Sequence, residues 1–107
     1  MKAQANQLNR FVVICTFKSG SRATFERGVK SIGEALQLAD DFWLLRAFGT
    51  AGSVRNQLFQ HMGARDTLMV LQLDAVRTAT QNFGPEMDAR VRAMLYLEAA
   101  VPLAVSA

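Results

Sequence analysis

The order of apolar patterns is the feature that most constrains what this chain can fold into. Residues 11–17 form an apolar run typical of a strand, and the next apolar residues recur at helical spacing. Two further strand patterns, a helix pattern and a last apolar strand follow. The predicted order is strand, helix, strand, strand, helix, strand, over residues 11–17, 22–32, 34–39, 42–48, 53–62 and 67–74.

Local signals bound the two predicted helices. Ser21 is a natural N-cap for the first helix, and Gly33 supplies the residue at which a helix stops. For the second helix either Thr50 or Ser53 can serve as the N-cap, and Gly63 is expected to end it.

The strands differ in how apolar their two faces are. The first strand, residues 11–17, and the third, residues 42–48, are apolar on both faces, which predicts central positions in a sheet. The second strand alternates weakly and fits an edge. The fourth, residues 67–74, is more apolar than a bare edge strand, so something is expected to cover it.

The pattern changes after Asp74. Val76, Ala79 and Phe83 suit a short helix, and Pro85 at a first helical position opens another. The buried stripe expected of this last helix comprises Met87, Val91, Met94 and Leu95.

The fold class predicted from these elements is α+β. The order strand–helix–strand–strand–helix–strand is that of the ferredoxin-like βαββαβ sandwich, here with a C-terminal helical extension. We expect a single domain over residues 1–107, comprising a flexible polar arm (1–9), a ferredoxin-like core (10–74) and a C-terminal helical segment (75–101).

Two helices can cover only one face of a four-stranded sheet. We expect Val12, Ile14, Trp43 and Leu45, with Leu68 and Val70, or the alternate residues of these strands, to fill the opposite face. Because an open face this apolar would be an unusually large exposed patch, the sequence predicts a homodimer in which the C-terminal segment takes part.

Composition limits the partners and the compartment. Twelve basic and nine acidic residues give a net charge of +3, which is compatible with an anionic partner without requiring one. The longest unbroken apolar run, residues 11–15, is far too short to cross a membrane. A single cysteine and a polar N-terminus without a signal pattern favour a cytoplasmic protein.

Residues 18–22 form the most suggestive short segment. Lys18, Ser19, Ser21 and Arg22 place two cations and two hydroxyls beside Gly20 at a helix N-terminus, where exposed N–H groups favour anions. A capped turn is the simpler interpretation, and an anion or nucleic-acid grip is the alternative. Arg55, near the start of the second helix, stands in a similar but weaker setting.

The remaining reactive residues do not assemble a recognisable catalytic set. Cys15 and His61 lie on different elements, and a buried strand cysteine behaves as a small hydrophobe. Asp40 and Asp41 are adjacent turn residues whose side chains point apart. Trp43 is better explained by packing than by base stacking. We therefore predict no catalytic residue, no metal site and no cofactor.

The hairpin, Trp43, the Ser/Thr-led helix with Arg55, and the segment 65–70 together resemble the small Cas2-type CRISPR-associated proteins. They also resemble stand-alone relatives such as virulence-associated protein D-type endoribonucleases. The resemblance implies a ferredoxin-like homodimer that either cleaves nucleic acid with a metal ion or acts as a scaffold beside it. In the family that this chain resembles, the nuclease chemistry depends on an Asp at the end of the first strand, which would hold the metal ion, and Thr16 occupies that position here.

The sequence therefore favours a non-catalytic Cas2-like homodimer that binds nucleic acid or a protein partner. The alternative is a small immunity protein or antitoxin that neutralises a partner toxin. A metal-dependent ribonuclease is disfavoured because the carboxylate that would hold the metal is missing.

Overall fold

The computed structural model describes residues 7–73 and 83–96. The chain divides into two compact units, residues 1–74 and 75–107. The first unit is a mixed α+β domain that contains every strand and helix predicted for it. Its elements are β1 (Leu8–Thr16), α2 (Arg22–Ile32), β2 (Glu34–Ala39), β3 (Phe42–Phe48), α3 (Ala51–Phe59) and β4 (Thr67–Leu73).

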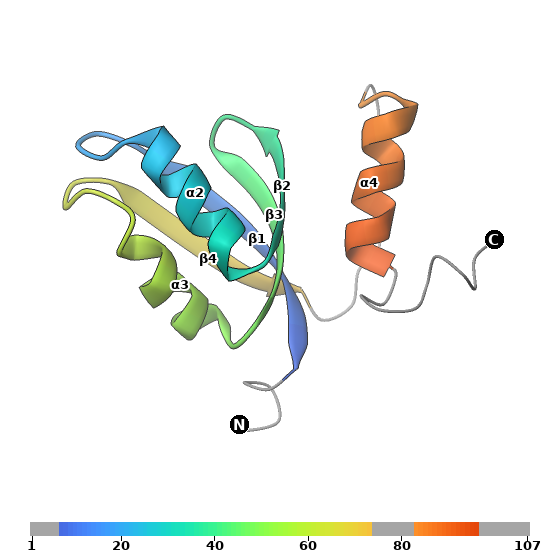
Figure 1. Ribbon diagram of the computed structural model, residues 1–107, viewed down its shortest axis with the longest axis horizontal. Coiled ribbons are helices and arrows are strands. Elements are labelled where there is room, and N and C mark those ends of the chain that lie inside the picture. Colours follow the sequence, from blue (N-terminus) through green and yellow to red (C-terminus); the bar gives the residue numbers. More distant parts are fainter. Residues whose placement is uncertain (1–6, 74–82, 97–107) are drawn as a thin grey trace. The chain divides into compact units, whose positions relative to one another are not determined.

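The four strands form one sheet in the order β2-β3-β1-β4, and every neighbouring pair is antiparallel. The two strands that are apolar on both faces, β1 and β3, occupy the centre, as their patterns predict. Helices α2 and α3 lie side by side over the same face of the sheet (Figure 1). The opposite face of the sheet is not covered by either of them.

Strand β1 begins earlier than the sequence predicts. Leu8 and Asn9, which the sequence places in a polar arm, pair with Phe48 and Ala47 of β3. The Asn9 side-chain amide also donates a hydrogen bond to the carbonyl oxygen of Gly49, at 2.6 Å. Pairing with the last residues of β3 therefore extends β1 into residues 8 and 9, although these belong to a segment that the sequence marks as polar. The part of the predicted arm before residue 7 lies outside the described residues.

The caps of the two helices follow from the residues just before them. The Ser21 hydroxyl accepts a hydrogen bond from the Thr24 N–H, which satisfies one free donor at the start of α2. At α3, Thr50 is the N-cap and Ser53 reciprocates, so that both hydroxyls accept from backbone N–H groups in a capping box. Because Thr50 rather than Ser53 is the cap, α3 begins two residues before the predicted start.

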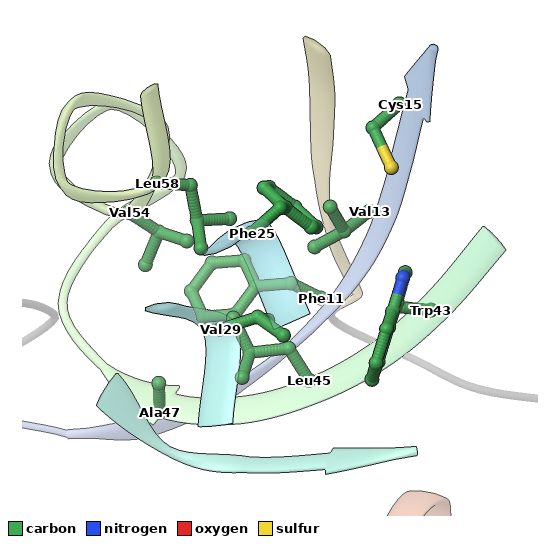
Figure 2. Packing of buried hydrophobic residues seen from close by; sticks show 10 residues of the cluster. All are labelled: Phe11, Val13, Cys15, Phe25, Val29, Trp43, Leu45, Ala47, Val54 and Leu58. Atoms are coloured by element: carbon green, nitrogen blue, oxygen red, sulfur yellow. The ribbon is translucent and has the colours of Figure 1, made fainter. Parts of the chain in front are cut away.

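Ten buried residues form the hydrophobic core between the helices and the sheet (Figure 2). Aromatic rings meet edge to face within it: the ring centroids of Phe25 and Trp43 are 6.5 Å apart. The ring of Phe17, which packs against the core, is 5.3 Å from that of Phe25. The core comprises Phe11, Val13 and Cys15 of β1, Phe25 and Val29 of α2, Trp43, Leu45 and Ala47 of β3, and Val54 and Leu58 of α3.

The register of β1 with β3 divides the four residues that the sequence grouped on the uncovered face. Trp43 pairs with Val13 and Leu45 with Phe11, so both lie on the helix-covered face, within the core. Val12 and Ile14 lie on the other face, opposite Leu44 and Phe42. The alternate residues of β3, rather than Trp43 and Leu45, therefore share the second face with Val12 and Ile14.

The second face of the sheet exposes large apolar side chains. Met69 is opposite Ile14 and Leu71 is opposite Val12, so β1 and β4 contribute adjacent apolar residues to it. The exposed fractions are 37% for Ile14, 55% for Met69 and 47% for Leu71, with Phe48 at 63% at the end of β3. Leu68 and Val70, on the opposite side of β4, pack against the core.

Helices α2 and α3 are linked through a close contact between Gly28 and His61. A Cβ atom built on Gly28 would lie 2.4 Å from two atoms of the His61 ring. Only glycine leaves room at this point of α2 for the imidazole that follows α3.

The second unit contains helix α4 (Pro85–Tyr96), which begins at the proline that the sequence marks as a helix start. Gly84 precedes it at a φ of +88°, in the region that favours glycine. Val91, Met94 and Leu95 are buried, three of the four positions predicted for its apolar stripe. The predicted short helix around Val76 and Ala79 lies outside the described residues. No helix in the described ranges is long and apolar enough to cross a membrane.

The core predicts a contrast between two neighbouring residues of α3. Leu58 is fully buried and Phe59 is 43% exposed. Leu58→Ala should lower the free energy of unfolding by about 2–5 kcal/mol, through lost burial and the cavity it leaves. Phe59→Ala serves as the control and should cost about 1 kcal/mol or less. Chemical denaturation of both variants tests this, and equal losses would contradict the described orientation of α3.

Candidate nucleic-acid interface

The loop between β1 and α2 is closed around a carboxylate from a distant part of the chain. One oxygen of Asp66, Oδ1, accepts hydrogen bonds from the backbone N–H groups of Lys18 (2.5 Å), Ser19 (2.7 Å) and Gly20 (3.2 Å). The other, Oδ2, accepts from the N–H of Gly63, at 2.7 Å. We call this arrangement the Asp66 clamp. It joins the β1–α2 loop to the turn that leads from α3 into β4.

The clamp holds Asp66 in its charged form. Its side chain is buried, with the residue only 6% exposed. Burial by itself raises the pKa of this carboxyl, but the four backbone N–H bonds outweigh that effect and hold the pKa well below its usual range.

Two glycines allow the loop and the turn to approach so closely. A Cβ atom on Gly20 would lie 2.3 Å from Asp66 Oδ2 and 2.6 Å from the Gly63 nitrogen. A Cβ atom on Gly63 would lie 2.2 Å from Ser19 Oγ and 2.7 Å from the Gly20 nitrogen. Because the atoms in the way include backbone, neither position has room for a side chain.

The contacts of the β1–α2 loop match the capped turn, the simpler of the two interpretations of residues 18–22. The N–H groups that could have gripped an external anion are bonded to Asp66. The Ser19 hydroxyl accepts from the N–H of Arg65 at 3.0 Å, and the Ser21 hydroxyl caps α2. What this segment can offer a ligand is therefore the side chains of Lys18 and Arg22.

Arg22 is held at the start of α2 by two contacts. Its guanidinium donates to the carbonyl oxygen of Asp40 at 2.6 Å and lies 5.4 Å from the centre of the Phe17 ring. Neither of these two contacts is with a carboxylate. The charge is therefore positioned at this end of the helical layer and exposed.

Exposed cations gather on the helices that cover the sheet. The basic helical surface consists of Arg22, Arg27 and Lys30 of α2, Arg55 of α3 and Arg65 of the following turn, all exposed. Glu26 is the one acidic residue of α2, and α3 has none. Since Asp66 is enclosed by the clamp, the surface carries a clear excess of positive charge.

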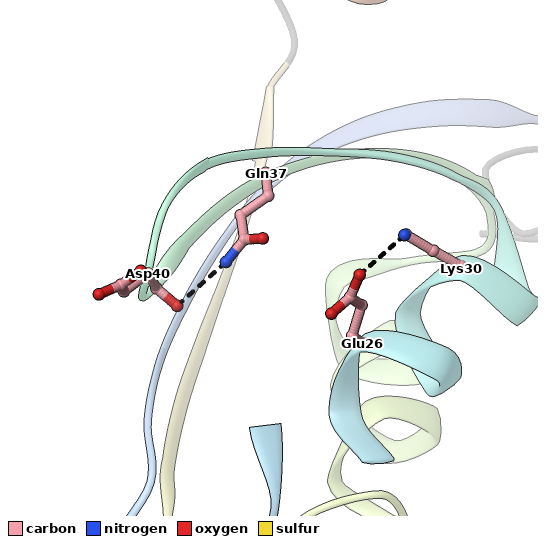
Figure 3. Close-up of polar contacts among 4 residues, drawn as sticks. All are labelled: Glu26, Lys30, Gln37 and Asp40. Atoms are coloured by element: carbon pink, nitrogen blue, oxygen red, sulfur yellow. Dashed lines mark hydrogen bonds and ion pairs between the residues drawn. The ribbon is translucent and has the colours of Figure 1, made fainter. Parts of the chain in front are cut away.

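The local partners of these cations are mostly neutral. Arg27 donates to the Thr24 hydroxyl at 3.4 Å, and Arg55 donates to the Asn56 side-chain oxygen at 3.0 Å. Lys30 is the exception, since it forms an ion pair with Glu26 at 2.8 Å (Figure 3). Figure 3 also shows the Gln37 amide bonded to the Asp40 carbonyl oxygen across the β2–β3 turn. Arg27 and Arg55 are thus available to an anionic ligand.

The other reactive residues lie apart from this surface. Cys15 is buried in the core, where its thiol lies 3.9 Å from the Asp41 carbonyl oxygen, whereas His61 packs against Gly28. No hydrogen bond joins Cys15 to His61, both of which are described. Thr16 pairs with Thr67 across β1 and β4 through their hydroxyls. Within residues 7–73 and 83–96, no three His, Cys, Asp or Glu side chains are placed to hold a metal ion.

The Asp66 clamp is the part of this region that the sequence did not reveal. Its local signals were an Asp directly before an apolar strand and glycines in two separate turns. Those local signals do not indicate that Asp66 bonds to Lys18 and Gly20, which lie more than 45 residues earlier in the sequence.

Comparison with protein-family models, curated proteins and solved structures finds no match to this chain.

The clamp predicts that Asp66→Asn lowers stability most at neutral pH. In the unfolded chain the carboxyl titrates near pH 4 (about 3.9), above its folded pKa. Between the two values the unfolded chain binds more protons, so the stabilisation is fully present above about pH 5 and is lost as the pH falls toward the folded pKa. Unfolding midpoints of wild type and variant should therefore differ most at pH 7, and the difference should be smaller at pH 3, where part of this stabilisation has been lost.

Asp41→Asn is the matched control for that comparison. Asp41 is exposed, and its contact with Cys15 uses the backbone carbonyl oxygen, which the substitution retains. It should unfold like the wild type at both pH values. A gap between Asp66→Asn and wild type that is independent of pH would show that the carboxylate charge is not what the clamp requires.

Burial raises the pKa of the Cys15 thiol to about 11. The thiol is therefore neutral and enclosed at pH 8, and both conditions suppress its reaction with an aromatic disulfide reagent. We expect negligible labelling of the folded protein and one thiol titrated in denaturant. Rapid labelling of the folded protein would contradict the described position of Cys15.

Proposed function

We propose that this protein is a non-catalytic, Cas2-like homodimer with a ferredoxin-like core, and that it binds nucleic acid through the basic helical surface. The observation that carries the proposal is the distribution of exposed cations and exposed apolar side chains. Exposed cations gather on α2, α3 and the following turn. Ile14, Phe48, Met69 and Leu71 are exposed on the face of the sheet that these helices leave open, whereas Phe59 is the one large apolar side chain exposed on α2 or α3.

Each surface suits a different kind of partner. Guanidinium groups that keep their charge and their donors are suited to phosphates along a nucleic-acid backbone. Exposed apolar residues such as Ile14, Met69 and Leu71 lose unfavourable contact with water when a second copy covers them. The strand order β2-β3-β1-β4 supports the ferredoxin-like arrangement, which has its first and third strands at the centre.

The proposal includes no catalytic role. A metal-dependent nuclease of the Cas2 type needs a carboxylate where Thr16 lies, and the Thr16 hydroxyl is a neutral ligand that already bonds Thr67. Asp66, the carboxylate that directly precedes β4, has its oxygens occupied by backbone N–H groups. We therefore propose that the protein positions nucleic acid without cutting it.

The alternative is a small immunity protein or antitoxin that binds a partner toxin. The same exposed apolar residues on the open face favour it, since they could meet a different protein rather than a second copy. A wild-type protein that stays monomeric and does not bind nucleic acid would favour this alternative.

Titration against labelled RNA and duplex DNA tests the nucleic-acid proposal. We expect micromolar binding at low salt that weakens steeply as salt is added. The double variant Arg27→Gln/Arg55→Gln should bind more weakly to every sequence. If each arginine neutralises one phosphate, the slope of log affinity against log salt should fall by about 1.8 for duplex DNA.

The double variant Arg90→Gln/Arg92→Gln is the control because it removes the same charge from α4. Its binding and salt slope should stay close to the wild type. Equal losses in both double variants would mean that net charge alone attracts the ligand. Absence of binding at low salt would overturn the proposal.

A further inference from the structure

The two edges of the sheet are built differently. Strand β2 carries Glu34, which pairs with Arg46 of β3, and its pairing is interrupted by a bulge between Gln37 and Ala39. A charge and a bulge are both devices that discourage another strand from joining an edge. The seven residues of β4 include no charged residue, no proline and no glycine.

Strand β4 also presents exposed apolar side chains beside the edge that is not paired with β1. In the part of the chain that is described, its one strand neighbour is β1. Met69 and Leu71 are 55% and 47% exposed on the face away from the helices, and Ile14 of β1 lies opposite Met69. A long, uncharged, apolar edge strand is a template for pairing with another strand.

We propose that the homodimer forms by antiparallel pairing of β4 with β4 of a second copy, which joins two four-stranded sheets into one. A two-fold interface brings a strand against itself, so residues near the axis meet their own copies. An uncharged strand tolerates this, whereas a strand carrying Glu34 would bring like charges together. With the axis at Val70, Met69 lies opposite Leu71 of the second copy, and each exposed apolar side chain gains an apolar neighbour.

This inference rests on the proposed homodimer and specifies its seam. The other way to form the dimer is to stack the open faces of two sheets. The two arrangements make different demands on Phe48, which is 63% exposed on that face but lies on β3, two strands away from the edge of β4 that is not paired with β1. Stacked faces would cover Phe48, and edge pairing leaves it outside the seam.

Charge placed at Met69 and Leu71 tests whether these residues lie in the interface, and Phe48→Lys then distinguishes the two arrangements. Met69→Lys/Leu71→Lys and Met69→Glu/Leu71→Glu each set like charges across the axis, so each should elute as a monomer, with half the wild-type mass by light scattering. Mixing the two variants sets opposite charges across the axis and should restore the dimer mass. Phe48→Lys should remain a dimer. Because mixing restores assembly only of folded chains, misfolding cannot imitate this set of results.

Pairing of β4 with β4 would be overturned if the double-Lys variant remained a dimer or if the mixture of the two variants stayed monomeric. A monomeric Phe48→Lys variant would also overturn it and would point to stacked faces. A wild-type monomer that still binds RNA with the expected salt dependence would overturn the dimer and leave the nucleic-acid proposal standing. A β4-dependent dimer that binds no RNA or DNA would support the seam and overturn the nucleic-acid proposal.

Discussion

One buried carboxylate ties together the end of the domain at which the central strand runs into the first helix. Asp66 accepts hydrogen bonds from N–H groups of the β1–α2 loop and of the α3–β4 turn, which lie at the same end of the β1–β4 pair, and so it joins the two segments. Both helices depend on this contact, since α2 starts from one connected segment and α3 ends in the other. In the clamp the Asp66 carboxylate bonds to the backbone N–H groups of the loop rather than to a basic side chain. Lys18, Arg22 and Arg65 nearby are exposed to solvent.

The secondary structure was accessible from the sequence because its signals are local. The apolar periods of residues 11–17 and 42–48 predicted strands, and their apolar character on both faces predicted central positions, which the strand order confirms. The N-cap at Ser21 was accessible for the same reason, whereas the sequence left Thr50 and Ser53 as alternatives for the cap of α3. Each of these features is decided within a few residues of the chain.

Features that depend on pairing between distant residues were less accessible. Trp43 and Leu44 are both apolar, so their pattern cannot say which of them faces the helices; the register with Val13 and Val12 decides it. Asp66 resembled an ordinary turn residue because its partners lie in a different turn. The basic helical surface was visible only as scattered Lys and Arg until the two helices were placed on one side of the sheet (Figure 1).

The missing side chain at Gly28 has a consequence for the cations on the outer surface. The His61 imidazole fits against the bare backbone of α2 at this position, which determines how near the end of α3 approaches. Arg27 is on α2 and Arg55 is on α3. The distance between their guanidinium groups therefore depends on the contact between Gly28 and His61, although neither arginine takes part in it. If these arginines bind phosphates as we propose, the regular spacing of phosphates along a nucleic-acid strand must match the distance between the two guanidinium groups, and Gly28 helps to set that distance.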